Sequence, residues 1–212
     1  MASTVVVDYG MGNLRSMAKA LEHAGAGDVR VTDDAETIAA ADRVVFPGQG
    51  AARDCMSALH AHELVDVLGE SMVRKPFLGA CMGMQVLLAW SEENGGIDLL
   101  GRFPGRIRHF RHHFTAKDTG LKVPHMGWNR VRQTTSHPLW AGIDDGEWFY
   151  FVHSYYAEPD EDALVLGRTD YGGPFASVLG RGNIFATQFH PEKSHDAGVR
   201  LLANFVRWDG AA

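Results

Sequence analysis

A cysteine lies between two glycines in "PFLGACMGMQVLLAW", residues 76–90. An apolar run typical of a strand precedes Cys81, and a run with helical spacing follows it. A residue at such a junction occupies a sharp strand-to-helix turn, the geometry of a nucleophile elbow, where Gly79 and Gly83 allow the two elements to pass closely. The start of the helix also favours a thiolate over a thiol. We therefore interpret Cys81 as a nucleophile. The alternative is a buried cysteine that packs as a small apolar side chain, which is how we interpret Cys55.

A base and an orienting group for this nucleophile are present in "ATQFHPEKS", residues 186–194. Along an extended strand, positions i and i+2 face the same way, so we expect His190 and Glu192 to share a side. A carboxylate beside an imidazole fixes its tautomer and stabilises the imidazolium. Pro191 donates no N–H, which indicates a strand end or edge. Taken alone, the segment also fits a surface His-Pro-Glu turn.

Glycines after another apolar run could supply donors for an oxyanion. The segment "VVFPGQGA", residues 44–51, places Gly48, Gln49 and Gly50 directly after a strand-like run. By itself "PGQG" predicts only a turn. Acyl transfer, however, needs N–H donors aimed at the developing oxyanion in addition to a nucleophile and a base. Together the three segments predict cysteine-based acyl transfer.

The elements that must position these residues alternate along the first ninety residues. We predict strands over 4–10, 28–32, 43–48 and 75–80, and helices over 13–25, 33–42, 55–70 and 82–93. From about residue 100, strand-like runs follow at 106–110, 125–132, 147–156, 163–169, 175–180 and 183–190, with a last helix over 195–208.

This alternation predicts an α/β fold with a mixed, mostly parallel central sheet flanked by helices. The later strands extend the sheet with antiparallel pairings. No linker or internal repeat is evident, so we expect a single domain over residues 1–212. Ligands of open α/β sheets bind outside the carboxyl ends of the strands, and Gly50 and Cys81 both follow such ends.

Composition excludes several classes of function. A formal net charge of −6 and a pI near 6.0 argue against nucleic-acid binding. No apolar run reaches membrane-spanning length, the first residues do not resemble a signal peptide, and two cysteines fit a reducing cytoplasm, so we expect a cytoplasmic protein without membrane association. The histidines of "HAHE" (60–63) and "RHHF" (111–114) lack metal-ligand spacing, so we expect no metal and no cofactor.

The motifs resemble those of the class I (triad-type) glutamine amidotransferases, which have G-x-C-x-G-x-Q at the elbow and H-P-E late in the chain. Here these are residues 79–85 and 190–192. Four further stretches are similar to the glutaminase subunits of imidazole glycerol phosphate synthases: "DYGMGNLRS", "PGQGA", "VPHMGWN" and "FYFVHSYY". The resemblance runs from about residue 5 to residue 208.

The resemblance implies hydrolysis of glutamine to glutamate and ammonia. Cys81 would form a γ-glutamyl thioester, His190 would move protons, and Glu192 would orient His190. Residues near the oxyanion would be Gly48, Gln49, Gly50 and Met82, and residues near the substrate would be Gln85, Glu93, His153, Ser154 and Tyr155. Glu93 suits the α-ammonium group, because a buried cation needs a paired charge; the adjacent Glu92 is the alternative.

The resemblance also implies a partner, a (β/α)₈-barrel synthase subunit that uses the ammonia to make imidazole glycerol phosphate and an aminoimidazole carboxamide ribonucleotide in histidine biosynthesis. The partner would cover the rim around Cys81, with Asn13, Trp128, Tyr150 and Lys193 at the interface. Aromatic residues are more often part of a core, which is the alternative for Trp128 and Tyr150.

Three other functions remain open. Another triad amidotransferase, feeding anthranilate or pyridoxal phosphate synthesis, would use the same chemistry with a different partner, but "PHMGWN" argues against it. A free-standing cysteine hydrolase of γ-glutamyl amides would turn over without any partner. A non-catalytic module would be favoured by a missing cysteine or histidine, and both are present.

Overall fold

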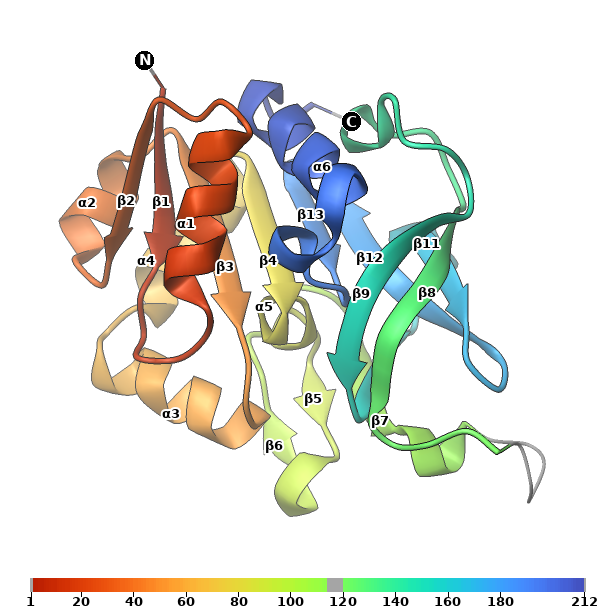
Figure 1. Cartoon of the computed structure of the whole chain (residues 1–212). Coiled ribbons are helices and arrows are strands. Elements are labelled where there is room, and N and C mark those ends of the chain that lie inside the picture. The colour runs from red at the N-terminus through yellow and green to blue at the C-terminus, as the bar shows by residue number, and fades with distance from the viewer. Residues whose placement is uncertain (1, 114–119, 212) are drawn as a thin grey trace.

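The computed structural model describes residues 2–113 and 120–211 (Figure 1). The helices are α1 (Leu14–His23), α2 (Ala35–Ala40), α3 (Ala52–Ala61), α4 (Val65–Arg74), α5 (Met82–Gln85) and α6 (His195–Arg207). The strands are β1 (Ser3–Val7), β2 (Asp28–Thr32), β3 (Arg43–Gly48), β4 (Phe77–Cys81), β5 (Trp90–Ser91), β6 (Ile97–Asp98), β7 (Gly105–His109), β8 (His125–Gln133), β9 (Glu147–His153), β10 (Tyr155–Pro159), β11 (Val165–Asp170), β12 (Pro174–Arg181) and β13 (Ile184–Thr187). Single 3-10 turns are η1 (Glu93–Gly95), η2 (Phe110–His112), η3 (Pro138–Trp140), η4 (Asp162–Leu164) and η5 (Pro191–Lys193).

One mixed sheet connects the described strands. Its main path runs in the order β2-β1-β3-β4-β13-β12-β10-β7-β5-β6, and the β8–β9 ribbon joins it through β11. The strands from β2 to β13 are parallel, whereas β12 pairs with β13, β11 and β10 in the antiparallel sense. The predicted fold class is confirmed, including the antiparallel extension in the second half of the chain.

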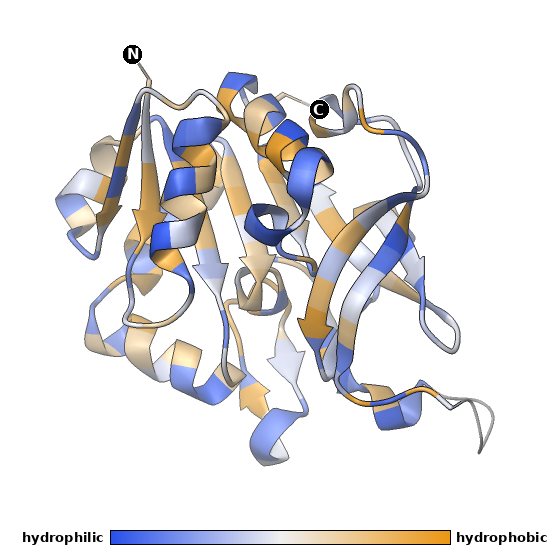
Figure 2. Ribbon diagram, in the orientation of Figure 1, coloured by the Kyte–Doolittle hydropathy of each residue, from blue (hydrophilic) through white to orange (hydrophobic). Residues whose placement is uncertain are grey.

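Helices cover both faces of the parallel part, and the sequence of β1 shows why. Val5 and Val7 pack into one apolar cluster while Val6 packs into the other, because successive side chains of a strand point to opposite faces. Helices α1 and α6 lie over the second face (Figure 1), and α2, α3 and α4 contribute their apolar sides to the first. Apolar residues therefore concentrate along the sheet and the inward helix faces in Figure 2.

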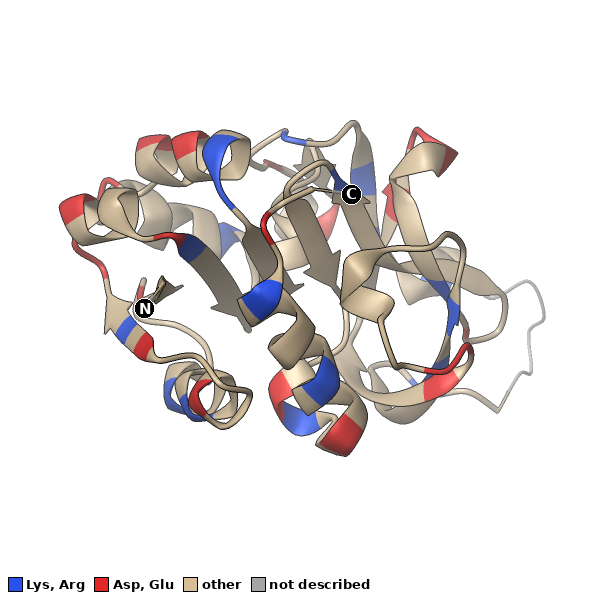
Figure 3. Ribbon diagram, turned by 90° about the horizontal axis from the view of Figure 1, so that it is seen from above, with Lys and Arg blue, Asp and Glu red and all other residues tan. Residues whose placement is uncertain are grey.

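Charged residues lie mainly outside this core. Acidic and basic residues are interspersed over the helices and loops in Figure 3, while the central strands are largely uncharged. Within the described part of the chain, no helix is long and apolar enough to cross a membrane.

Besides the strand predicted over 183–190, which ends at Thr187, three predicted elements differ from the structure. The helix predicted over 55–70 is divided into α3 and α4, because Glu63 between them adopts a left-handed φ of 55°. The helix predicted over 82–93 ends after one turn, and residues 90–91 form a strand instead. All seven residues from Met82 to Leu88 are buried, so their apolar run reflects burial on every side and not a long amphipathic helix. The strand predicted over 147–156 is divided at Ser154.

Candidate active site

The nucleophile elbow predicted around Cys81 is present at the junction of β4 and α5. Cys81 has φ 55° and ψ −106°, a strained backbone conformation that costs about 1–3 kcal/mol and is concentrated at functional sites. The flanking glycines are required by close packing. A Cβ on Gly83 would lie 1.8 Å from the carbonyl oxygen of Phe46, and one on Gly79 would lie 2.5 Å from the carbonyl oxygen of Gly83. The sequence-based reason for both glycines is confirmed.

The His-Pro-Glu segment lies beside this elbow, although its backbone is not the extended strand that we expected. Strand β13 ends at Thr187, and residues 191–193 form η5 with His190 at its start. In this turn the Nδ1 atom of His190 lies 3.0 Å from Oε1 of Glu192, and the two side chains are 5% and 3% exposed. The imidazole and the carboxylate are thus brought together by a 3-10 turn, and not by the alternation of side chains along a strand.

Hydrogen bonds to β9 fix the position of this turn. The N–H of His190 donates to the carbonyl of Tyr150 (3.0 Å), and the N–H of Tyr150 donates to Oγ of Ser194 (3.0 Å). The Ser194 hydroxyl in turn donates to the carbonyl of His190 (2.6 Å). Gly198 allows α6 to pack against the turn, because a Cβ there would lie 1.9 Å from the carbonyl oxygen of Pro191.

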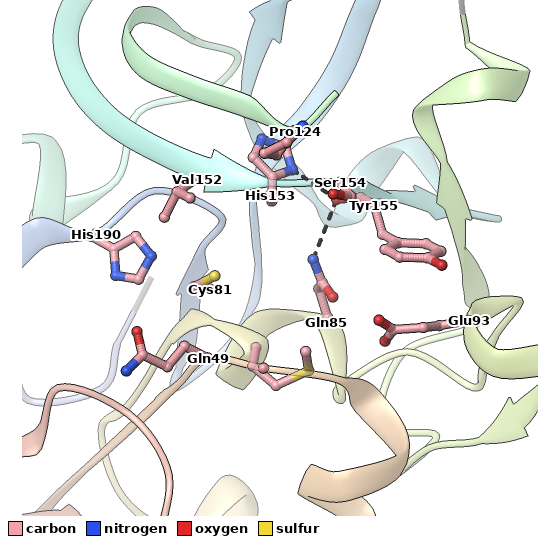
Figure 4. A pocket seen from close by; sticks show the side chains of 12 residues that line it. Gln49, Cys81, Gln85, Glu93, Pro124, Val152, His153, Ser154, Tyr155 and His190 are labelled. Atoms are coloured by element: carbon pink, nitrogen blue, oxygen red, sulfur yellow. Dashed lines mark hydrogen bonds between the residues drawn. The ribbon is translucent and has the colours of Figure 1, made fainter. Parts of the chain in front are cut away.

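The charge of His190 follows from its two neighbours. Burial disfavours the imidazolium, but bonding and attraction to the Cys81 sulfur and to the Glu192 carboxylate outweigh it and raise the pKa of His190 to about 10. Because Nδ1 faces Glu192, Nε2 is the atom left for the sulfur. Among the described residues this buried Nε2 has no hydrogen-bond partner, so it remains available to a group that enters the cavity. Figure 4 shows the imidazole and the sulfur at the same cavity.

The cavity has a volume of about 300 Å³ and opens at the carboxyl ends of β3 and β4. It is lined by Gln49, Gly50, Cys81, Met82, Gln85, Glu93, Pro124, Val152, His153, Ser154, Tyr155 and His190 (Figure 4). Gly48 does not line it but pairs with Cys81 across the two strands. Three of the four oxyanion candidates, Gln49, Gly50 and Met82, therefore line the cavity that contains Cys81. Gly50 has a left-handed φ of 99° that favours glycine.

Comparisons with known proteins identify the family. The family model for glutamine amidotransferase class-I matches residues 5–208. This chain belongs to the class-I glutamine amidotransferase family. It is 55% identical to imidazole glycerol phosphate synthase subunit HisH of Pseudomonas putida, over 99% of both chains. It is 57% identical to the subunit of the same name from Methylococcus capsulatus, over 99% of this chain and 98% of the other. Its fold matches PurLQS from Thermotoga maritima with a TM-score of 0.72 at 17% identity, over 97% of this chain and 98% of the other.

The five residues expected to hold glutamine in a class-I amidotransferase all line the cavity. The structure also separates Glu93 from Glu92. Glu93 faces the cavity, accepts a hydrogen bond from the N–H of Ala52 (2.7 Å), and has a pKa raised by burial. Glu92 instead accepts from the N–H of His109 (2.6 Å) and lies 3.1 Å from Nε of Arg108. Only Glu93 is therefore placed to meet a cation in the cavity.

Three of the four expected interface residues form a cluster beside the cavity. The Trp128 and Tyr150 rings contact edge to face at 6.0 Å, and Nζ of Lys193 lies 5.9 Å from the Tyr150 ring. Trp128 also stacks on His195 and is 42% exposed, so it is not a core residue. Asn13 lies at the start of α1, which packs near η5.

Sequence reasoning did not single out Gln188 and His125, which contact the site residues from behind. The amide of Gln188 lies 3.7 Å from the Cys81 sulfur, and Nδ1 of His125 lies 2.9 Å from Nε2 of His153. Gln188 lies two residues before His190, and His125 belongs to the "PHMGWN" stretch, so both were in segments that the sequence had marked. Over the ranges 2–113 and 120–211, no group of three His, Cys, Asp or Glu side chains could hold a metal ion.

Proposed function

We propose that this chain hydrolyses L-glutamine to glutamate and ammonia through Cys81, His190 and Glu192, as the glutaminase subunit of an imidazole glycerol phosphate synthase. One observation supports the chemistry above all others. The strained cysteine and the buried imidazole line one cavity, and the imidazole contacts its buried carboxylate, in a chain of the class-I amidotransferase family.

The reaction uses the proton at Nε2 of His190. The Cys81 thiolate attacks the δ-carbonyl carbon of glutamine, and the carbonyl electron pair moves onto oxygen. When the tetrahedral intermediate collapses, Nε2–H protonates the leaving nitrogen and ammonia departs, which leaves a thioester. Water then attacks the thioester carbon and gives its proton to Nε2. The C–S bond breaks, glutamate leaves, and the thiolate is restored beside the imidazolium.

The walls of the cavity suit the two ends of glutamine. Glu93 would pair with the α-ammonium group, since a carboxylate that burial makes costly gains most from a cation. Gln85 and residues 153–155 would hold the remaining polar atoms of the substrate. Peptide N–H groups near Gly48, Gln49, Gly50 and Met82 would receive the oxyanion, because an N–H dipole stabilises the carbonyl oxygen most when that oxygen becomes negative.

The relatives' shared name, a synthase subunit, supports a partner. We propose a (β/α)₈-barrel synthase subunit that makes imidazole glycerol phosphate and covers the rim around Cys81. Ammonia released into water becomes ammonium, which is not nucleophilic, so a covered path between the two sites has a chemical reason. Trp128, Tyr150, Lys193 and Asn13 would contact this partner. Cys55 and Cys81 are both free thiols, which fits action in the cytoplasm.

The first experiment measures glutamate release from glutamine by the full chain, alone and with a histidine-pathway synthase subunit and its nucleotide ligand. We expect strong stimulation by the pair and no activity in Cys81→Ala, with Cys55→Ala as the matched control. Cys81-dependent turnover that the synthase does not change would retain the chemistry and refute the partner. Turnover that survives Cys81→Ala would refute the mechanism.

A further inference from the structure

The amide groups behind the nucleophile have a defined orientation, which follows from one backbone carbonyl. The carbonyl of Tyr155 only accepts hydrogen bonds, and Nε2 of Gln85 lies 3.3 Å from it (Figure 4). The amide nitrogen of Gln85 is thereby identified. The same nitrogen lies 3.0 Å from Oε1 of Gln188, and both side chains are buried. The oxygen of Gln188 is therefore occupied, and its NH₂ group must face the other way.

The NH₂ group of Gln188 faces the nucleophile. Its Nε2 atom lies 3.7 Å from Sγ of Cys81, within the range of a hydrogen bond to sulfur. Gln188 is completely buried, and its backbone N–H donates to the carbonyl of Ser177 (2.8 Å), so the side chain has a fixed origin. The sulfur thus has an amide donor within reach, and it shares its cavity with the imidazole of His190.

The neutral His153 also bonds to the Tyr155 carbonyl, and the neutral His125 bonds to His153 in turn. Nδ1 of His153 lies 2.7 Å from this carbonyl and must donate to it. Nε2 of His153 then accepts from Nδ1 of His125 at 2.9 Å, and Nε2 of His125 accepts from the amide of Asn129 at 3.2 Å. Each donor in this chain points the same way, so one set of tautomers satisfies every contact.

We propose that Gln188 donates a hydrogen bond to the Cys81 thiolate, and that Gln85, the Tyr155 carbonyl and the His125–His153 pair hold it in the donating orientation. This inference rests on the proposed glutaminase function. The bond acts at two stages. It stabilises the thiolate that attacks glutamine, and it stabilises the same thiolate as it leaves the thioester. His190 remains the group that moves protons.

The test is the rate at which iodoacetamide alkylates Cys81 between pH 4 and 10, read by mass spectrometry of the cysteine-containing peptide. Ionisable groups that act on the sulfur from other elements are His190 at η5 and Tyr9 after β1. Both are unchanged in the variants. Gln188→Met keeps the length of the side chain but removes the donor. We expect its alkylation midpoint to move up by about one pH unit, because a hydrogen bond to a charged group is lost.

Gln133→Met is the matched control. Gln133 lies on β8 outside the cavity, and its amide donates to the carbonyl of Ile143 (2.9 Å). Its midpoint should equal that of the unmodified chain. Gln188→Glu keeps the shape and the acceptor for Gln85, but it replaces the donor by an acceptor, so its midpoint should rise further than that of Gln188→Met. If Gln188→Met does not fold, Gln188→Leu replaces it, because it also removes the donor without adding a charge.

An unchanged midpoint in Gln188→Met, with folding verified by circular dichroism, would overturn the proposal, even if Gln188→Glu shifts through its charge. If Gln188→Leu takes its place, an unchanged midpoint there would overturn the proposal in the same way. The readout needs no turnover of glutamine. A chain that never releases glutamate but shows the shift would therefore refute the glutaminase function and leave the Gln188–Cys81 bond established.

Discussion

Two groups of buried histidines lie in this active site, and they hold opposite charge states. His190 is 4% exposed and has a pKa of about 10, whereas His125 and His153 are 3% and 6% exposed and have pKa values of about 4 and 3. Burial is the same, so it cannot explain the difference. The partners do. His190 faces a carboxylate and a sulfur, whereas the other two face a carbonyl, an amide and each other.

The two groups also respond to pH in opposite directions. A histidine whose folded pKa is raised stabilises the fold below its unfolded value of about 6.5, and this contribution is lost as pH rises toward 10. A histidine that is neutral in the fold stabilises it above about 6.5, and this is lost as pH falls toward 4. The active site is therefore expected to be most stable near neutral pH.

The largest effect is expected from removal of the carboxylate that charges His190. In Glu192→Gln the amide can donate to Nδ1 and leave the proton on Nε2, where the imidazole can no longer accept from Cys81. We expect kcat for glutamate release to fall by about 10³- to 10⁴-fold, as for a triad with the wrong tautomer. A stopped assay with the partner and ligand at saturation measures this.

Glu161→Gln is a suitable control, since Glu161 is exposed and pairs with Arg181 at the surface, an arrangement worth little. It should retain the full rate. A Glu192→Gln variant that folds and keeps more than about a tenth of the rate would show that the carboxylate does not orient His190 for catalysis.

An intermediate effect is expected when acid protonates a neutral histidine of the fold. A third neutral histidine, His137, lies outside the active site, so its contribution can be measured separately. His137 starts η3, accepts from the N–H of Leu139 (3.1 Å), and burial lowers its pKa to about 4. Acidification from pH 6.5 to pH 5 should lower the free energy of unfolding by roughly 2 kcal/mol through His137, because the unfolded chain takes up a proton there that the folded chain does not. His137→Asn keeps an acceptor at this cap but does not titrate.

Urea unfolding at pH 6.5 and at pH 5 measures this effect. The packing of His137 on Phe185 and Trp208 is lost in the variant at both pH values, so it cancels in the difference. We expect the loss of free energy of unfolding on acidification to be smaller in His137→Asn by roughly 2 kcal/mol. Equal losses in both chains would mean that His137 is not neutral in the fold.

The residues that charge His190 could be predicted from the sequence, as could the sheet that positions them. Cys81, His190 and Glu192 were found because local spacing and turn chemistry indicate a nucleophile elbow and an oriented base. The alternation of strands and helices predicted the sheet that brings them together. The predicted backbone between His190 and Glu192 was wrong, because the two residues are joined by the 3-10 turn η5 and not by a strand. A proline after histidine fits both backbones.

The supporting residues could not be found in this way. Gln188 reaches Cys81 across a separation of 107 residues, and His125 reaches His153 across the β8–β9 ribbon. Neither contact has a local pattern, because it depends on the register of strands that are distant along the chain. The helix predicted over 82–93 failed for a related reason: an apolar run has the same composition whether it is one face of a helix or wholly buried.

The smallest effect is expected when a carboxylate is placed beside the neutral His125–His153 pair. Asn129 donates to Nε2 of His125 and also to the carbonyl of Asp170 (2.9 Å). In Asn129→Asp a carboxylate would face both acceptors, and protonation of His125 would relieve the contact. We expect the pKa of His125 to rise from about 4 by about 1–3 units. NMR titration of the imidazole signals measures it directly.

Asn129→Ala separates charge from the loss of a donor. It removes the bond to His125 but adds no carboxylate, so the pKa of His125 should stay low. If the neutral pair positions Gln85 and Gln188, kcat should fall in Asn129→Asp by less than about ten-fold, equivalent to about 1.4 kcal/mol, and by less in Asn129→Ala. The reason is that a charged His125 donates from Nε2 to the new carboxylate instead of accepting there, which disturbs the single direction of donors. A raised His125 pKa with an unchanged kcat would show that the neutral pair stabilises the fold without positioning the nucleophile.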